Sequence, residues 1–192
     1  MLTGRFTDAL AYAVRLHASQ TRKGTATPYI AHLMAVAGLA LEYGATEDEA
    51  IAALLHDAVE DQGGAETREE IRRRFGEDVA GIVDECSDTD QQPKPPWRAR
   101  KEAHLNRLRT ATESVRLIVA ADKLHNARTL LADWRAQGEA VWDRFTGGRE
   151  GTLWYYRSLV ELLRSAGATP MVEELARVVA ELEHLVGGDA VV

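Results

Sequence analysis

The sequence has very little cysteine and proline. Its 192 residues include one cysteine, Cys86, and five prolines. A lone cysteine has no partner within the chain, which excludes a disulfide-stapled scaffold and fits a reducing, cytoplasmic setting. With only 15 glycines besides, the chain is also far from the composition of a collagen-like or linker-like protein.

Long hydrophobic runs are missing as well. The longest one covers residues 33–41, whereas a helix needs about 20 apolar residues to cross a bilayer. Residues 1–14 lack the charged, apolar and small-residue regions that make up a signal peptide. We therefore expect a cytoplasmic protein with no membrane partner.

Positive charge is in deficit. The chain has 23 Lys and Arg against 30 Asp and Glu, a net charge of −7. Such a chain repels nucleic acid unless its basic residues gather locally. Residues 98–109 are locally basic, and we interpret them as the solvated face of a helix. We expect no nucleic-acid partner.

The sequence does contain helical periodicity along nearly its whole length. From Phe6 to His17, apolar residues recur three and four positions apart, as on a helix with one face in the core. No segment alternates with period two. We expect an all-α single domain over residues 1–192, with loops at 20–28 and 87–96. The expected helices cover residues 6–17, 29–44, 47–61, 67–76, 77–86, 97–110, 113–137, 152–165 and 170–185.

The helix expected at 47–61 carries an unusual set of polar residues. It opens with a capping-box pair, Thr46 and Glu49, and its second half reads Ala-Leu-Leu-His-Asp-Ala-Val-Glu-Asp over residues 53–61. On a continuous helix, residues four apart share a face, so His56 would lie above Glu60 and Asp57 above Asp61. Ionisable groups inside an apolar helix need partners, and a metal ion is one way to supply them.

Two more apolar helices are interrupted by possible metal ligands. His32 interrupts the helix at 29–44, and Asp122 interrupts the one at 113–137. Together with His56 and Asp57 they make a mixed nitrogen and oxygen set, which suits Mn²⁺, Fe²⁺ or Zn²⁺ better than Ca²⁺. A metal lowers the pKa of a water that it binds and makes it a nucleophile near neutral pH. Glu60 and Asp61 would then orient that water or move its proton.

Four short blocks, in this order, narrow the interpretation to a family. They are Arg-Lys-Gly at 22–24, Thr-Pro-Tyr-Ile-Ala-His at 27–32, Leu-Leu-His-Asp-Ala-Val-Glu-Asp at 54–61 and Ala-Asp-Lys-Leu-His-Asn-Ala-Arg-Thr-Leu at 121–130. This pattern resembles the HD-domain metal-dependent phosphohydrolases, and within them the hydrolase domain of the RelA/SpoT alarmone enzymes. A chain of this size is most similar to the stand-alone small alarmone hydrolases of the Mesh1-like group. The resemblance covers residues 6–160, with a helix at about 170–186 packed on that core.

The resemblance implies a fold, a reaction and a set of site residues. The fold would be an HD-type bundle of about ten helices. The reaction would be hydrolysis of the 3′-pyrophosphate of guanosine tetra- or pentaphosphate, a small-molecule substrate of the stringent response, with one divalent metal ion, Mn²⁺. The metal ligands would be His32, His56, Asp57 and Asp122, and the acidic pair serving the attacking water would be Glu60 and Asp61. The substrate-binding residues would be Arg22, Lys23, Asn126, Thr129, Lys94 and Arg149.

Other interpretations stay open. The chain could be an HD phosphohydrolase for another nucleotide, such as NADPH, an adenosine alarmone or a nucleoside monophosphate. It could also be a catalytically silent nucleotide-binding regulator, or a plain helical scaffold. The oligomeric state is not predicted. Of the remaining histidines, we expect His17 to be a buried, hydrogen-bonded core residue, His104 and His184 to lie on the surface, and His125 not to bind a second metal.

Overall fold

The computed structural model describes residues 1–87 and 93–188, and within these ranges it contains helices and no β-strand. An isolated bridge between Thr21 and Pro28 closes the loop after the first helix. The all-α prediction is confirmed. The helices are α1 (Gly4–Leu16), α2 (Ile30–Glu42), α3 (Glu47–Leu55), α4 (Ala58–Asp61), α5 (Gly64–Phe75), α6 (Glu77–Cys86), α7 (Trp97–Leu108), α8 (Glu113–Gln137), the 3₁₀ helix η1 (Gly138–Arg144), α9 (Gly148–Ala166) and α10 (Pro170–Gly188).

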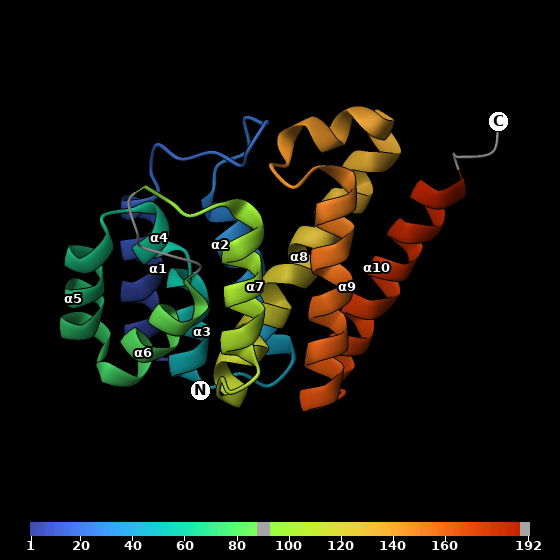
Figure 1. Cartoon of the computed structure of the whole chain (residues 1–192). Helices are drawn as coiled ribbons and strands as arrows, with labels where there is room; N and C mark the ends of the chain where they lie inside the picture. Colours follow the sequence, from blue (N-terminus) through green and yellow to red (C-terminus); the bar gives the residue numbers. More distant parts are fainter. Residues whose placement is uncertain (88–92, 189–192) are drawn as a thin grey trace.

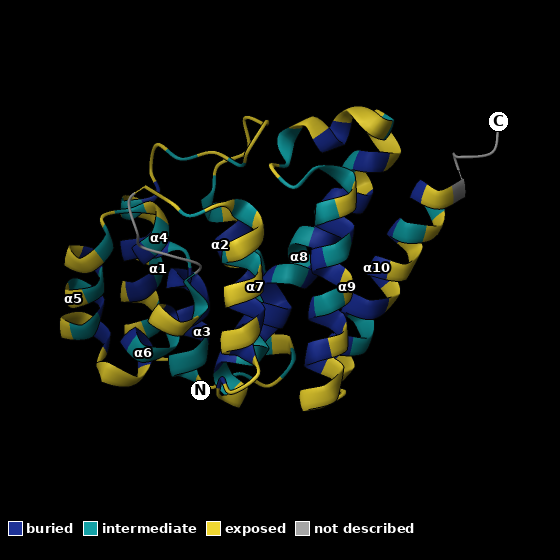
Figure 2. Cartoon of the chain, viewed as in Figure 1, coloured by how far each residue is buried: buried dark blue, intermediate teal, exposed yellow. Residues whose placement is uncertain are grey.

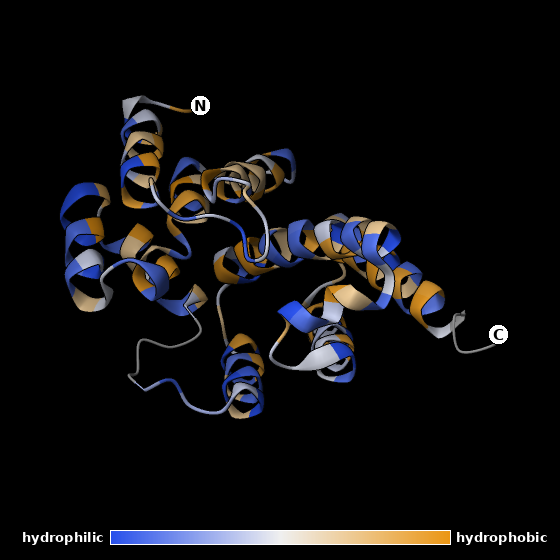
Figure 3. Ribbon diagram, turned by 90° about the horizontal axis from the view of Figure 1, so that it is seen from above, coloured by the Kyte–Doolittle hydropathy of each residue, from blue (hydrophilic) through white to orange (hydrophobic). Residues whose placement is uncertain are grey.

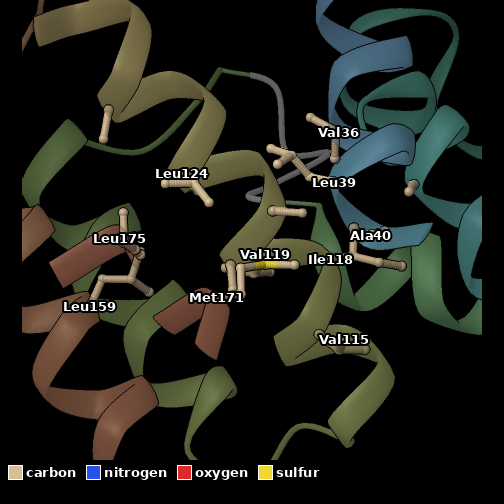
Figure 4. Close-up of a cluster of buried hydrophobic side chains, with 14 of the residues drawn as sticks. Val36, Leu39, Ala40, Val115, Ile118, Val119, Leu124, Leu159, Met171 and Leu175 are labelled. Atoms are coloured by element: carbon tan, nitrogen blue, oxygen red, sulfur yellow. The ribbon is translucent and has the colours of Figure 1, made fainter. Parts of the chain in front are cut away.

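Helix α8 is the central element. It packs against α2 and α6 on one side and against α10 and η1 on the other (Figure 1). Apolar side chains of α8 such as Ile118 and Leu124 are fully buried, and Figure 4 shows them between residues of α2 and residues of α9 and α10. Because α8 is covered on opposite sides, its apolar residues are not confined to a single stripe.

One hydrophobic cluster runs through the molecule and involves nearly every helix. Figure 2 shows buried residues on the inward faces of the helices and exposed residues on the outer faces, and hydrophobic and hydrophilic segments alternate along the helices in Figure 3. Helix α3 is buried all round, from Ala50 to Leu55. Full burial of a leucine or isoleucine such as Ile51 stabilises the fold by about 1.5–3 kcal/mol.

The end of α3 differs from the sequence-based expectation. The capping box of Thr46 and Glu49 is present as predicted. However, the single helix expected at 47–61 is wrong, because α3 ends at Leu55 and α4 begins at Ala58. Asp57 lies between them with φ −96° and ψ −3°. The backbone N–H of Asp61 donates to the carbonyl of Asp57, so Asp57 begins the short turn of α4.

Two other segments depart from the expected boundaries. Helix α5 begins at Gly64 rather than at residue 67, and α9 begins at Gly148 rather than at residue 152. The segment after α8, to which the sequence assigned no structure, forms η1. Gly138 ends α8 with φ +58°, a left-handed conformation that glycine adopts without strain. Residues 88–92 of the loop expected at 87–96 lie outside the described ranges.

Ion pairs attach helix α10 to α8 and α9, and in these pairs α10 supplies the carboxylates. Its glutamates accept from arginines of the two helices beside it. On α8 the pairs are Arg128–Glu174 and Arg135–Glu181. On α9 they are Arg157–Glu183 and Arg164–Glu173. No helix in the described part of the chain is both long and apolar enough to cross a membrane.

Candidate metal and nucleotide site

Four nitrogen and oxygen atoms from three parts of the chain meet at one point. His32 comes from α2, His56 and Asp57 from the break between α3 and α4, and Asp122 from α8. The Nε2 atom of His56 lies 3.0 Å from Oδ2 of Asp57 and 3.8 Å from Oδ1 of Asp122. The Nε2 atom of His32 lies 3.6 Å and 3.3 Å from the same two oxygens. The structure thus brings the four expected ligands together.

The orientation of the His56 ring fits a divalent cation at this point. Nδ1 of His56 lies 2.8 Å from the carbonyl oxygen of Ala53, so it carries the proton and leaves the Nε2 lone pair for another partner. Nε2 of His56 is buried and makes no hydrogen bond to any described residue. The ligand atoms of His32, His56 and Asp57 all lie within 4.8 Å of one another. These residues could therefore hold a divalent cation.

His125 supports His32 from behind. The Nδ1 atoms of the two rings lie 2.8 Å apart. Burial, together with the neighbouring His32 and Arg22, lowers the pKa of His125 to about 4, so this ring is neutral and its Nδ1 can accept a hydrogen bond from Nδ1–H of His32. His125 is not among the converging atoms, and the sequence analysis did not foresee its role. The sequence did contain a signal for this role, because His125 follows Asp122 by three residues and so lies on the same side of the helix.

Tyr29 supports Asp57 in the same way. Its hydroxyl donates to Oδ2 of Asp57, and burial together with the charge of Asp57 raises the pKa of Tyr29. The ring of His17 stacks on Tyr29 at 5.4 Å between centroids. As expected, His17 is buried, and its Nδ1 is hydrogen-bonded to Gln20. Tyr29 belongs to the motif at residues 27–32, but no function was predicted for it from the sequence.

The electrostatics keep both carboxylates charged. Burial favours the protonated form of Asp57, but His56 and His32 hold its pKa well below the usual range. Burial is likewise outweighed at Asp122, where Lys123 and the two histidines lower the pKa. Burial also disfavours a charged His56, yet Asp57 raises its pKa to about 9.

The two acidic residues of α4 lie in different surroundings. Glu60 lines a cavity beside the histidines and accepts from Lys94 Nζ at 2.8 Å. Asp61 is more exposed and accepts from Nε2 of Gln20 at 2.7 Å. Desolvation and the charge of Asp57 raise the pKa of Asp61. Asp61 lines neither of the two cavities described below.

Two cavities adjoin at this site. The His–Asp cavity, about 480 Å³, contains His56, Asp57, Glu60 and Asp122. The aromatic cavity, about 320 Å³, contains Arg22, Tyr29, Asn126, Thr129 and Asp133. Both are lined by Lys23, Trp97, Lys101, Lys123, Arg144, Phe145 and Tyr155. The two adjoining cavities therefore offer cations, aromatic rings and the His–Asp cluster, which together suit a polyanion that carries an aromatic ring.

Most of the expected nucleotide-binding residues line these cavities. Arg22 also donates to Oδ1 of Asn126 at 2.7 Å, and Asn126 in turn donates to Oδ1 of Asp122. Arg149, which was also expected to bind the nucleotide, lies apart from these cavities. Its guanidinium lies against Glu139 and the carbonyl of Val186, so it secures the end of α10 and lines neither cavity.

The structure adds cations that the sequence analysis did not assign. Arg144 and Lys123 line both cavities. From α7, Lys101 also lines both cavities and Arg100 lines the His–Asp cavity, so this helix is more than a solvated basic face. His104, expected on the surface, is 4% exposed and also lines the His–Asp cavity; this expectation was wrong because the polar residues of α7 face both the cavity and solvent.

Comparisons with known proteins agree with this geometry. A family model described as "HD domain" matches residues 9–153. The guanosine-3′,5′-bis(diphosphate) 3′-pyrophosphohydrolase MESH1 of Xenopus tropicalis is 39% identical over 126 residues, which cover 64% of this chain and 68% of that protein. The protein of the same name from Homo sapiens is 37% identical over the same shares.

Solved structures extend the likeness to nearly the whole chain. A structure described as a metazoan ortholog of SpoT that hydrolyses ppGpp aligns with a TM-score of 0.77 and 30% identity, covering 94% of this chain and 97% of that one. The lmo0812 protein of Listeria monocytogenes EGD-e aligns with a TM-score of 0.68 and 28% identity, covering 81% of this chain and 99% of that one.

Proposed function

Because this chain belongs to the HD domain family, we propose that it is a guanosine-3′,5′-bis(diphosphate) 3′-pyrophosphohydrolase. The observation that carries the proposal is the convergence of His32, His56, Asp57 and Asp122 at one end of a cation-lined double cavity. The relatives with this printed activity, and a structural neighbour described as hydrolysing ppGpp, support the choice of substrate. A cytoplasmic location remains a prediction from the sequence.

In this proposal His32, His56, Asp57 and Asp122 hold one divalent cation, and Mn²⁺ suits their mixed donor set. When bound, the cation polarises the phosphoryl group and lowers the pKa of the attacking water. Tyr29 and His125 orient two of the ligands through the contacts described above.

The remaining residues handle protons and charge. Glu60, which faces the His–Asp cavity, accepts the proton of the attacking water, and its ion pair with Lys94 holds its carboxylate in position. Asp61 holds Gln20, which also contacts His17, behind Tyr29. Lys23, Lys101, Lys123 and Arg144 neutralise the phosphates, while Arg22 and Asn126 contact the nucleoside.

The proposal is tested by turnover and metal content together. Purified protein is incubated with Mn²⁺ and a panel of guanosine tetraphosphate, NADPH, nucleoside triphosphates and nucleoside monophosphates, and the products are separated by anion exchange. We expect release of pyrophosphate from guanosine tetraphosphate, abolished by a chelator. Turnover of another nucleotide alone would replace the substrate, and tight binding without turnover would favour a regulator.

Two variants separate metal binding from proton transfer. Asp57→Ala should lose both bound metal and turnover. Glu60→Gln should keep the metal and lose about 10²–10⁴-fold in rate, the usual contribution of a general base. Metal is measured by mass spectrometry and rate by pyrophosphate release, with the exposed Glu66→Gln on α5 as control. Full activity in both site variants would refute the assignment.

A further inference from the structure

Asp133 is an acidic residue in an otherwise cation-rich nucleotide cavity. It lies in α8 and lines the aromatic cavity. Its Oδ2 accepts from Nη2 of Arg144 at 2.7 Å, and its side chain is 26% exposed. A carboxylate is an unfavourable neighbour for a polyphosphate, so the position calls for an explanation. The following inference rests on the proposed function.

The spacing along α8 indicates which part of a nucleotide reaches Asp133. Asp122, Asn126, Thr129 and Asp133 follow one another at intervals of three or four residues and so share one side of the helix. Asp122 belongs to the His–Asp cluster and the other three line the aromatic cavity. At a rise of 1.5 Å per residue, Asp133 lies about 16 Å along the axis from Asp122. With the reacting 3′-phosphate at Asp122, two parts of the nucleotide extend away from it, the base and the 5′-diphosphate. The carboxylate of Asp133 repels a diphosphate, so the base is the part that points toward Asp133.

The chemistry at this end favours one purine. A carboxylate only accepts hydrogen bonds, and the Arg144 contact occupies one of several lone-pair positions on its two oxygens. Guanine presents two neighbouring donors, N1–H and its 2-amino group, whereas adenine presents an unprotonated N1 at the same edge. A charged acceptor makes a stronger hydrogen bond than a neutral one, and it repels the lone pair of adenine N1.

Arg144 holds the carboxylate in place. Its side chain crosses Gly24, where a Cβ atom would lie 2.5 Å from Cδ of Arg144, and Gly24 has φ +75°. The Nε atom of Arg144 is buried without a hydrogen-bond partner among the described residues. Arg144 thus joins the loop after α1, the end of η1 and Asp133 of α8 into one wall of the cavity.

We propose that Asp133, held by Arg144, selects guanine by accepting from N1–H and the 2-amino group of the base at the far end of the aromatic cavity. The inosine analogue keeps N1–H but lacks the amino group, and the adenosine analogue lacks both donors in that arrangement. The wild-type protein therefore prefers guanosine to inosine and inosine to adenosine.

The test measures kcat/KM for the 3′,5′-bis(diphosphates) of guanosine, inosine and adenosine. The full chain is compared with Asp133→Asn, Arg144→Gln and Asp143→Asn, the last an exposed neighbour on η1 that lines neither cavity. We expect Asp133→Asn to reduce the guanosine-to-adenosine ratio by about 10- to 100-fold, the effect of losing a hydrogen bond to a charged group. Arg144→Gln should lower all three rates, because Arg144 also lines the His–Asp cavity, and should reduce the guanosine-to-adenosine ratio less than Asp133→Asn does, because the carboxylate is still present but no longer held. Asp143→Asn should change neither the rates nor the ratio.

Two outcomes would overturn the inference. If Asp133→Asn and Arg144→Gln lower all three rates equally, Asp133 only anchors η1. If the wild-type protein does not discriminate between the bases, nothing selects guanine. Should the wild type hydrolyse none of the substrates, the proposed function fails separately. Calorimetric binding of GDP, IDP and ADP to the same proteins then decides: a guanine preference that is lost in Asp133→Asn and retained in Asp143→Asn supports the inference, and equal affinities of the wild-type protein for the three nucleotides refute it.

Discussion

At the scale of single residues, three of the four candidate ligands are positioned by groups that do not converge on the site themselves. Tyr29 donates to Asp57, His125 contacts His32, and the carbonyl of Ala53 fixes the ring of His56. Such supporting groups set the orientation of a ligand and the tautomer of a histidine. Their removal should therefore weaken metal binding while the ligands remain.

Tyr29→Phe tests this directly. Losing the hydroxyl that holds Asp57 should weaken metal affinity by about 10- to 100-fold, because the carboxylate becomes free to rotate. The dissociation constant is measured by competition with a fluorescent chelator. Tyr43→Phe, at the end of α2, is the matched control and should leave it unchanged. Equal affinities for the two variants would mean that Tyr29 does not position Asp57.

The sequence predicts some of these residues and not others. His32, His56, Asp57 and Asp122 could be identified because each interrupts an apolar helix, which is visible in the order of the residues. Asp133 and Arg144 could not, because their proximity depends on the fold of η1 over the loop at Gly24. The position of Arg149 could not be predicted for the same reason: the sequence does not reveal that its guanidinium contacts the carbonyl of Val186 on α10.

At the scale of elements, helix ends decide where the site residues lie. α3 begins at a capping box and ends where His56 and Asp57 enter the site. The start of α3 could be predicted from the sequence, since Thr46 and Glu49 are three residues apart and form a capping box. The end of α3 could not be predicted, because the helical periodicity of the sequence continues through the break at residues 56–57. At this break Asp57 contacts Tyr29 and His32, which are distant in the sequence.

Thr46→Ala should destabilise the protein. The substitution removes the side-chain acceptor for the N–H of Glu49 and costs about 1 kcal/mol in the free energy of unfolding. Urea denaturation followed by circular dichroism measures the change. Thr46→Ser keeps the hydroxyl and should retain most of the stability; a loss as large as that of alanine would show that the cap contributes little.

Gly147→Ala should affect substrate binding through α7. A Cβ atom at Gly147 would lie 2.6 Å from the ring of Trp97, which lines both cavities. The indole must shift, so we expect a higher KM with a smaller change in kcat. Gly81→Ala in α6 is the control, because open space surrounds it, and it should stabilise the protein by about 0.5–1 kcal/mol. An unchanged KM in Gly147→Ala would argue against a role for Trp97 in substrate binding.

At the scale of the whole molecule, the reaction site and the core share α8. Polar side chains of this helix, such as Asp122 and Asn126, line the cavities, while Leu124 packs between α2 and the C-terminal helices. The sequence predicted a helix at 113–137 and an all-α class. It could not predict that this helix would be central, since that depends on which apolar faces pair.

Met171→Ala tests whether the C-terminal part of the core can be weakened without harming the site. Met171 is fully buried against α8, and its truncation should cost about 2–5 kcal/mol and lower Tm by roughly 2–4 °C for each kcal/mol. At a temperature where the variant is folded, kcat/KM should stay unchanged. Met34→Ala, at an exposed position, should have little effect on Tm. A fall in kcat/KM for folded Met171→Ala would show that the two regions are coupled.

The ion pairs of α10 restrict how this helix can pack against α8 and α9. On α8 the paired residues increase together, Arg128 with Glu174 and Arg135 with Glu181, so the two helices run parallel. On α9 they run in opposite directions, Arg157 with Glu183 and Arg164 with Glu173. Sliding α10 by seven residues would still offer a glutamate to one arginine of α8, but it would break both pairs with α9. The combination leaves α10 a single docking register, although each exposed pair alone contributes only about 0–1 kcal/mol.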